Sequence, residues 1–244
     1  MDGEAASEPR SESAVLHRVL RSPGVMLLAV LTLLLGLLVN PWWVPTGDSE
    51  VFLVAGRNLA NGGGLVYGNT RLAFVPPGWP MVLAGMMTLT DQVIWLKLFQ
   101  VVCMGAFLWM SFRVLCRFTS PGKAALATGL AAICSPLYPL SVWLHSDPLF
   151  CVLMIAAMAV ALQWSDGHWP GWTIGVVFVL LIAGLLIRWA GLPMSVVVAA
   201  ACLGGGAAGA ESSRERPSRL SRWLVAGLML VVAFASFLTI RAML

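Results

Sequence analysis

The stretch Leu224–Ile240, LVAGLMLVVAFASFLTI, contains no charged residue. As a helix it approaches the length that the roughly 30 Å hydrocarbon core of a bilayer requires. Lipid offers no hydrogen-bond partner to backbone groups, so a crossing segment of this kind must be helical. Further apolar segments precede it, and the sequence therefore predicts an all-α, polytopic transmembrane helical bundle with about seven spans. The others are Val25–Trp43, Trp95–Val114, Ala124–Leu140, Pro148–Trp164, Thr173–Ile187 and Ala190–Cys202.

The composition excludes an ordinary soluble domain. Hydrophobic residues make up 59% of the chain and charged residues 11%, whereas a soluble domain has roughly 45–50% and about 25%. The formal net charge of +4 does not indicate a nucleic-acid partner, because the basic residues lie between apolar segments and form no stripe on a soluble face.

The positions of Lys and Arg predict the orientation. With the N-terminus in the cytoplasm, ten basic residues fall inside and five outside, as the positive-inside rule requires. We therefore expect a multi-pass protein of the plasma (inner) membrane. The inside set is Arg10, Arg18, Arg21, Arg113, Arg117, Lys123, Arg214, Arg216, Arg219 and Arg222, and the outside set is Arg57, Arg71, Lys97, Arg188 and Arg241.

The chain divides into a polar cytoplasmic N-terminal tail, residues 1–22, and a transmembrane domain, residues 23–244. The domain contains a first outer loop, residues 44–91, and a basic, Gly/Ala/Ser-rich cytoplasmic loop, residues 204–222. Within the outer loop we expect two short helices, Asp48–Ala60 and Met81–Thr88. The first is amphipathic and both are predicted to lie at the membrane surface.

Two acidic residues are candidates for chemistry. Asp48 follows the first span, where a carboxylate is able to act as a general base on a hydroxyl from the outer side; alternatively, it is the N-cap of the surface helix. Asp147 precedes Pro148 at the start of the fourth span. Asp followed by Pro is also an ideal N-cap and first-turn pair, so both interpretations stay open.

Several other polar residues are weaker candidates. Arg188 lies between two short apolar segments, where it either binds phosphate or extends to water from the interface. Arg71 and Arg57 are further cations of the outer loop that are suited to pairing with Glu50 or Asp48. His145, near Asp147, is a conceivable metal ligand without a partnering cluster. The cysteines lie in apolar surroundings and are interpreted as small buried hydrophobic residues.

The order of motifs along the chain resembles a known family. Gly47-Asp48-Ser49-Glu50, Ala55-Gly56-Arg57-Asn58-Leu59, Gly64-Leu65-Val66-Tyr67-Gly68 and Pro76-Pro77-Gly78-Trp79-Pro80 follow the first span. Ser146-Asp147-Pro148-Leu149-Phe150 and Leu186-Ile187-Arg188-Trp189-Ala190-Gly191-Leu192 come later. This ordered set resembles the GT-C type membrane glycosyltransferases, above all the dolichyl-phosphate-mannose protein mannosyltransferase and lipid A aminoarabinose transferase branch, over roughly Val25 to Ile240.

The resemblance implies a function and a set of site residues. It implies inverting transfer of a hexosyl or pentosyl group from a polyprenyl-phosphate donor to a hydroxyl of a lipid, glycan or protein acceptor at the outer face. Asp48 would be the catalytic base, Asp147 a second site acid, and Arg188 and Arg71 the donor-phosphate ligands. Further substrate-site candidates are Glu50, Arg57, Tyr67 and His145. No cofactor is implied with certainty, and a divalent metal ion stays open.

One departure from the family pattern concerns the C-terminus. Members of the family continue beyond a seventh span with a second large outer loop, whereas this sequence stops at Leu244, so we expect a chain truncated relative to the family. Two alternatives to a transferase follow: a non-catalytic protein that binds or helps to transport lipid-linked sugars, and an inactive truncated fragment.

Overall fold

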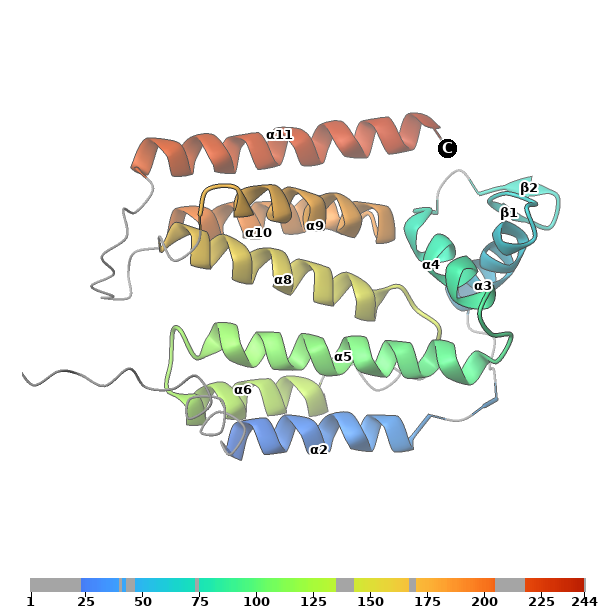
Figure 1. Ribbon diagram of the computed structural model, residues 1–244, viewed down its shortest axis with the longest axis horizontal. Helices are drawn as coiled ribbons and strands as arrows, with labels where there is room; N and C mark the ends of the chain where they lie inside the picture. Colours follow the sequence, from blue (N-terminus) through green and yellow to red (C-terminus); the bar gives the residue numbers. More distant parts are fainter. Residues whose placement is uncertain are drawn as a thin grey trace, which may run out of the picture.

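The computed structural model describes residues 23–39, 41–42, 47–72, 75–134, 143–166, 170–204 and 218–243. The described part is all-helical apart from one small hairpin, which confirms the predicted all-α class. Its long helices lie side by side with their axes roughly parallel (Figure 1). They are α2 (Pro23–Leu37), α5 (Val93–Leu115), α6 (Pro121–Cys134), α8 (Asp147–Ser165), α9 (Thr173–Ile187), α10 (Gly191–Gly204) and α11 (Arg219–Met243).

The remaining elements gather at one end of the bundle, which we call the α3/α4 end (Figure 1). They are α3 (Gly47–Ala60), α4 (Gly78–Met87) and an antiparallel hairpin of β1 (Val66–Tyr67) and β2 (Thr70–Arg71). Asn58 Nδ2 donates a hydrogen bond to the Val66 carbonyl at 2.9 Å, which ties the hairpin to α3. Gly68 has a φ of 59° in the connecting turn, a conformation that glycine adopts without steric cost.

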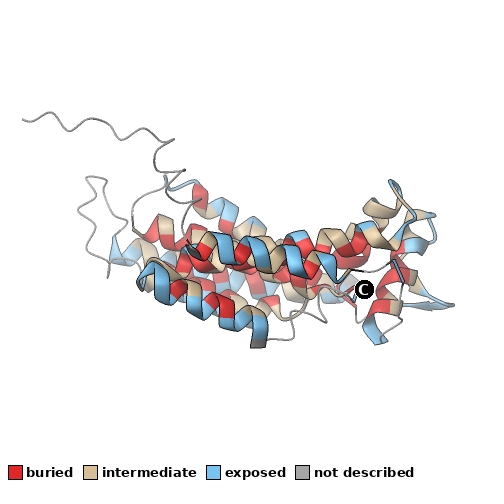
Figure 2. Ribbon diagram, turned by 90° about the horizontal axis from the view of Figure 1, so that it is seen from below, coloured by how far each residue is buried: buried red, intermediate tan, exposed pale blue. Residues whose placement is uncertain are grey.

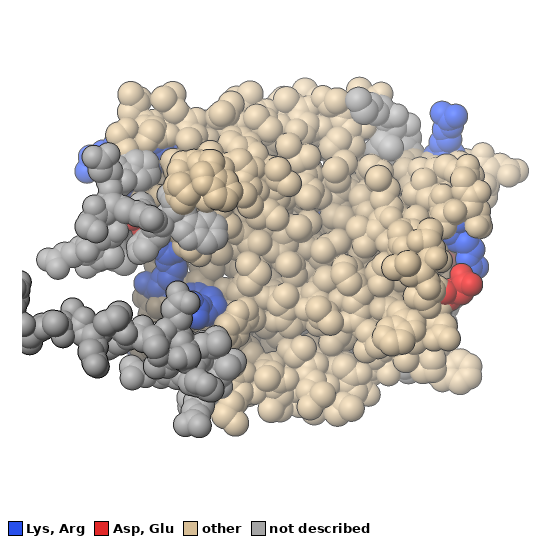
Figure 3. Space-filling view, viewed as in Figure 1, with Lys and Arg blue, Asp and Glu red and all other residues tan. Residues whose placement is uncertain are grey.

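Three helices are long and apolar enough to cross a membrane: Val93–Leu115, Asp147–Ser165 and Arg219–Ala242. The prediction of membrane-spanning helices is confirmed at this level. Four shorter apolar helices of 10–17 residues accompany them, namely Gly24–Leu37, Gly78–Met87, Thr173–Ile187 and Gly191–Leu203. On the face shown in Figure 3, the charged side chains lie near the two ends and the middle is free of them, as expected of a surface that faces lipid.

Three clusters of buried hydrophobic side chains hold the described part of the bundle together. One lies among α2, α5 and α6 and contains Leu28, Met104, Leu108, Phe112 and Ala124. A second joins α3, α4 and the start of α5 to α8, α9, α10 and α11. A third, smaller cluster joins the end of α5 to α8. Buried positions face between helices while the outer faces are exposed, as Figure 2 shows. From Leu220 to Leu238 the exposed positions of α11 are apolar. In water they would form an exposed hydrophobic patch, but in lipid they need no cover.

Most helices coincide with apolar segments of the sequence, but the first predicted span, Val25–Trp43, extends past α2, which ends at Leu37. The predicted Thr173–Ile187 is α9, and the predicted Asp48–Ala60 begins one residue later than α3. The third predicted span extends to Leu140, whereas α6 ends at Cys134 and residues 135–142 lie outside the described part. The tail of residues 1–22 and most of the loop 204–222 also lie outside it.

A close backbone contact attaches α4 to the bundle. A Cβ on Gly78, at the start of α4, would lie 2.7 Å from the backbone carbonyl carbon and oxygen of Leu186 near the end of α9. Trp79, the next residue, is fully buried. Similarly, a Cβ on Gly56 of α3 would lie 2.9 Å from the Leu83 Cβ of α4. Glycine thus lets α3 pack on α4 and α4 pack on α9.

The Gly78→Ala variant is expected to be less stable, because its Cβ would meet backbone atoms of Leu186 that no side-chain rotation removes. Overpacking of this kind costs about 1–3 kcal/mol. Thermal unfolding of the purified protein in detergent measures this loss as a lower midpoint. Gly85→Ala in the same helix is the matched control, since a Cβ there meets nothing within 4 Å. Equal midpoints for the two variants would contradict the α4–α9 contact.

Candidate functional site

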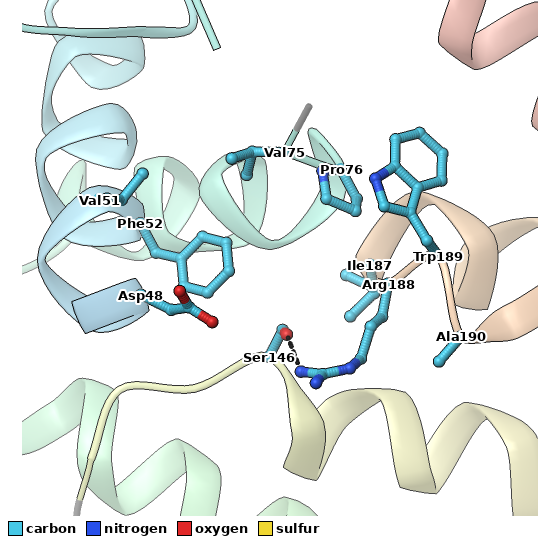
Figure 4. A pocket seen from close by; sticks show the side chains of 10 residues that line it. All are labelled: Asp48, Val51, Phe52, Val75, Pro76, Ser146, Ile187, Arg188, Trp189 and Ala190. Carbon is cyan, nitrogen blue, oxygen red and sulfur yellow. Dashed lines mark hydrogen bonds between the residues drawn. The ribbon is translucent and has the colours of Figure 1, made fainter. Parts of the chain in front are cut away.

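A cavity of about 450 Å³ opens at the α3/α4 end of the bundle. This volume lies within the range of roughly 300–1,000 Å³ that small-molecule sites occupy. Three polar side chains line it, those of Asp48, Ser146 and Arg188, and they come from three distant parts of the sequence (Figure 4). The rest of the lining is apolar and consists of Val51, Phe52, Val75, Pro76, Ile187, Trp189 and Ala190.

Arg188 reaches the cavity because α9 ends directly before it. Its backbone is extended, with φ −156° and ψ 136°, and its amide donates to the Gly184 carbonyl at 2.8 Å. A tight turn then leads into α10, where a Cβ on Gly191 would lie 2.9 Å from the Leu185 amide nitrogen. The two short apolar segments are therefore separate helices, and the basic side chain projects from the turn between them.

An ion pair orients the Arg188 guanidinium. Its Nη1 lies 2.7 Å from Asp147 Oδ2 and donates a longer hydrogen bond, 3.4 Å, to Ser146 Oγ. The two charged side chains retain 39% and 23% of their exposure, so solvent screens the pair and its contribution to stability is about 0–1 kcal/mol. Its main effect is to fix the direction of the guanidinium.

Asp147 is not an N-cap. It is the first residue of α8, and Ser146 occupies the N-cap position without a side-chain capping hydrogen bond. Pro148 stands in the first turn, as the Asp-Pro sequence predicts. The Asp147 carboxylate instead pairs with Arg188, across 41 residues of sequence, which the sequence pattern alone did not indicate.

Asp48 lies within the first turn of α3, which begins at Gly47. Its backbone position near the helix N-terminus favours a negative charge. Its carboxylate points toward the cavity from the side opposite Arg188, with Phe52 one turn further along the same helix (Figure 4). The side chain is exposed to solvent, so a hydroxyl-bearing molecule in the cavity has access to it.

His145 stands beside the cavity in the segment before α8. Burial lowers the pKa of its imidazole, while Asp147 and Asp48 oppose this shift and Arg188 adds to it. Its backbone carbonyl accepts a hydrogen bond from Gln100 Nε2 at 2.6 Å. This buried polar contact anchors the segment on the first turns of α5.

Of the predicted site residues, Asp48 and Arg188 line the cavity, whereas the others are not part of its lining. Tyr67 donates a hydrogen bond to Glu50 Oε1 at 3.0 Å on the exposed side of α3, and this bond together with the negative charge of Glu50 raises the pKa of the Tyr67 hydroxyl. Arg57 is exposed in the last turn of α3, and Arg71 is exposed on β2. The structure thus brings together four of the predicted residues: Asp48, His145, Asp147 and Arg188.

Sequence reasoning missed other residues of the cavity. Ser146 and Trp189 adjoin Asp147 and Arg188 in the motifs quoted above, so adjacency was an available signal. The apolar wall that Phe52 and Val75 contribute required the tertiary structure. Within the described ranges no group of three or more His, Cys, Asp and Glu side chains is arranged to hold a metal ion.

No protein-family model, no curated protein and no solved structure matches this chain. The class of protein therefore follows from the structure itself. It is an all-helical protein with helices suited to membrane insertion, and it has a partly apolar cavity with acidic and basic side chains at one end of its bundle.

Acidification below pH 6.5, the ordinary pKa of histidine, is expected to destabilise the protein. The unfolded chain takes up a proton on His145 there, whereas the partly buried ring of the folded chain has a lowered pKa and resists protonation. The contribution of His145 to stability is thus fully present above the pKa of this residue in the unfolded chain. It is lost as the pH falls toward the lower pKa of His145 in the folded chain. Unfolding midpoints at about pH 7.5 and about pH 5.5 measure this, because the two values lie on either side of the ordinary pKa of histidine.

The control for this prediction is His145→Gln, which keeps the backbone contact to Gln100 and removes the titrating ring. We expect a smaller decrease in the midpoint between the two pH values for this variant. An equal decrease in both proteins would assign the pH dependence to other groups.

Proposed function

We propose that the chain is a membrane-embedded transferase that moves a hexosyl or pentosyl group from a polyprenyl-phosphate donor to a hydroxyl acceptor. The observation that carries the proposal is the shared cavity of Asp48 and Arg188, with Asp147 paired to Arg188. A carboxylate and a guanidinium face one partly apolar space beside membrane helices. This combination suits a reaction in which a hydroxyl loses a proton and a lipid phosphate leaves.

The chemistry assigns a role to each charged side chain. The Asp48 carboxylate accepts the proton of the acceptor hydroxyl, whose oxygen attacks the anomeric carbon of the donor sugar. The bond between that carbon and the phosphate oxygen breaks, and the electron pair stays on the phosphate. Arg188, which is oriented by Asp147, neutralises the leaving phosphate through charge-assisted hydrogen bonds. Attack opposite the leaving group inverts the configuration of the anomeric carbon.

The order of motifs that resembles the GT-C glycosyltransferases supports the same assignment. In the proposed arrangement all seven long helices cross the plasma membrane, with the N-terminus in the cytoplasm and α3, α4 and the cavity at the outer face. Helices of 14 or 15 residues such as α6 and α9 span only about 21–23 Å, so the bilayer would thin locally around them. The polyprenyl chain would lie in lipid while its phosphate meets Arg188.

The Asp48→Asn variant is expected to lose about 10²–10⁴ in transfer rate, because the amide accepts no proton. The assay follows labelled mannose from a mannosyl-phosphoryl-polyprenol donor to acceptors in a membrane extract, with the protein in liposomes. Glu50→Gln is the matched control: it makes the same change two residues away, outside the cavity, where Glu50 contacts Tyr67. Near-normal transfer by Asp48→Asn would remove Asp48 as the base.

The Arg188→Gln variant is expected to bind polyprenyl phosphate about tenfold or more weakly, since a hydrogen bond to a charged group contributes about 1.5–3 kcal/mol. Binding of a fluorescent polyprenyl phosphate to the detergent-purified protein measures this directly. Arg71→Gln separates the two predicted phosphate ligands, because Arg71 is exposed on β2 and does not line the cavity. Equal weakening in both variants would argue for general charge attraction.

These two assays also separate the transferase from a non-catalytic protein. A chain that binds polyprenyl phosphate through Arg188 but transfers no sugar, with or without Asp48, would be a lipid-linked-sugar binding protein. A chain that neither binds polyprenyl phosphate nor transfers sugar would correspond to the third alternative, an inactive fragment.

A further inference from the structure

A second polar pocket lies at the end of the bundle opposite the cavity, which we call the far end. It has a volume of about 340 Å³. It is lined by Arg113 and Val114 at the end of α5, by Arg117 in the turn that follows α5, and by Ala159 and Gln163 from α8. The chain runs along α5 from the α3/α4 end to this far end (Figure 1). Basic side chains are visible at this end in Figure 3.

The two guanidinium groups of the pocket differ in their contacts. Arg117 forms an ion pair with Asp166, which follows the last residue of α8. Arg113 has no acidic partner within the described part of the chain; its Cζ lies 5.9 Å from the centre of the Trp109 ring, in a cation–π contact. Two arginines and one aspartate leave the pocket with one positive charge in excess, and Gln163 adds a neutral hydrogen-bonding group.

An apolar groove is linked to the basic pocket by the contact between Arg113, which lines the pocket, and Trp109, which lines the groove. Trp109 precedes Arg113 by one helical turn on the same face of α5, and it lines a groove of about 700 Å³ between α2 and α5. Apart from the Trp109 indole, Thr32 has the one polar side chain of this lining, and its hydroxyl already donates to the Leu28 carbonyl at 2.8 Å. Beyond Trp109 the lining is therefore apolar, which suits a hydrocarbon chain better than a polar ligand.

We propose that the far end binds an anionic phospholipid, with the headgroup phosphate held by Arg113 and Arg117 and one acyl chain in the groove between α2 and α5. A phospholipid whose headgroup has a net negative charge matches the single excess positive charge of the pocket. Trp109 lies at the junction, where amphipathic indole rings commonly mark the boundary of the hydrocarbon region. Basic pockets between membrane helices are recognised binding sites for anionic headgroups. The proposal is independent of the transferase assignment.

Native mass spectrometry of the full chain in detergent tests this. The probes are phosphatidylglycerol and phosphatidylcholine with identical acyl chains. We expect the wild type to retain phosphatidylglycerol preferentially, and Arg113→Gln to weaken that binding about fivefold or more without changing the retention of phosphatidylcholine. Arg219→Gln is the matched control, because Arg219 is exposed at the same end on α11 and does not line the pocket. Equal effects of the two variants, or no lipid preference in the wild type, would overturn the proposal.

The groove is tested separately with Ala29→Phe. Ala29 lines the groove and is exposed, so a phenyl group fills the space without altering any charge. We expect weaker retention of phosphatidylglycerol in this variant; retention equal to the wild type would overturn the acyl-chain assignment. Inorganic phosphate distinguishes a lipid site from a simple anion site, and displacement of the lipid by inorganic phosphate alone would also overturn the proposal.

Discussion

The contact between Gly78 and Leu186 connects the two parts of the molecule. Because glycine lacks a Cβ, the start of α4 approaches the backbone of α9 near its end, directly beside the turn that carries Arg188. The close contact between Gly56 and Leu83 then sets α3 against α4. Through this sequence of contacts the Asp48 carboxylate on α3 and the Arg188 guanidinium after α9 come to line one cavity. A displaced α4 would therefore separate these two groups.

Small residues and polar contacts have particular weight where helices pack within lipid, as the three long apolar helices of this bundle are suited to do. Apolar side chains gain little from association there, so small residues and hydrogen bonds between helices decide which helices pair. Here Gly105 of α5 lies against Thr32 of α2, and Gly184 of α9 against Met154 of α8. Ser165 Oγ donates to the Cys202 carbonyl at 2.7 Å and joins α8 to α10.

Charge is confined to the ends of the bundle, and the two ends differ. At the α3/α4 end acidic and basic side chains face each other across a cavity, as in Asp48 and the Asp147–Arg188 pair. Buried Lys97 and Gln100 reinforce that end by donating hydrogen bonds to the carbonyls of Trp42 and His145. At the far end the pocket of Arg113 and Arg117 is basic. Ligands with a charged head and an apolar tail suit both places, because each lies where polar and apolar surfaces meet.

The sequence by itself determined the all-α class, the positions of most helices and the break at Arg188, because long apolar runs and a charged residue between them leave few local alternatives. It also singled out Asp48, Asp147 and Arg188 one by one. Only the tertiary structure decided that Asp147 pairs with Arg188 across 41 residues, and that Glu50, Arg57, Tyr67 and Arg71 lie outside the cavity. Local propensity is set by neighbours within a few residues, whereas these pairings depend on how glycine contacts position whole helices.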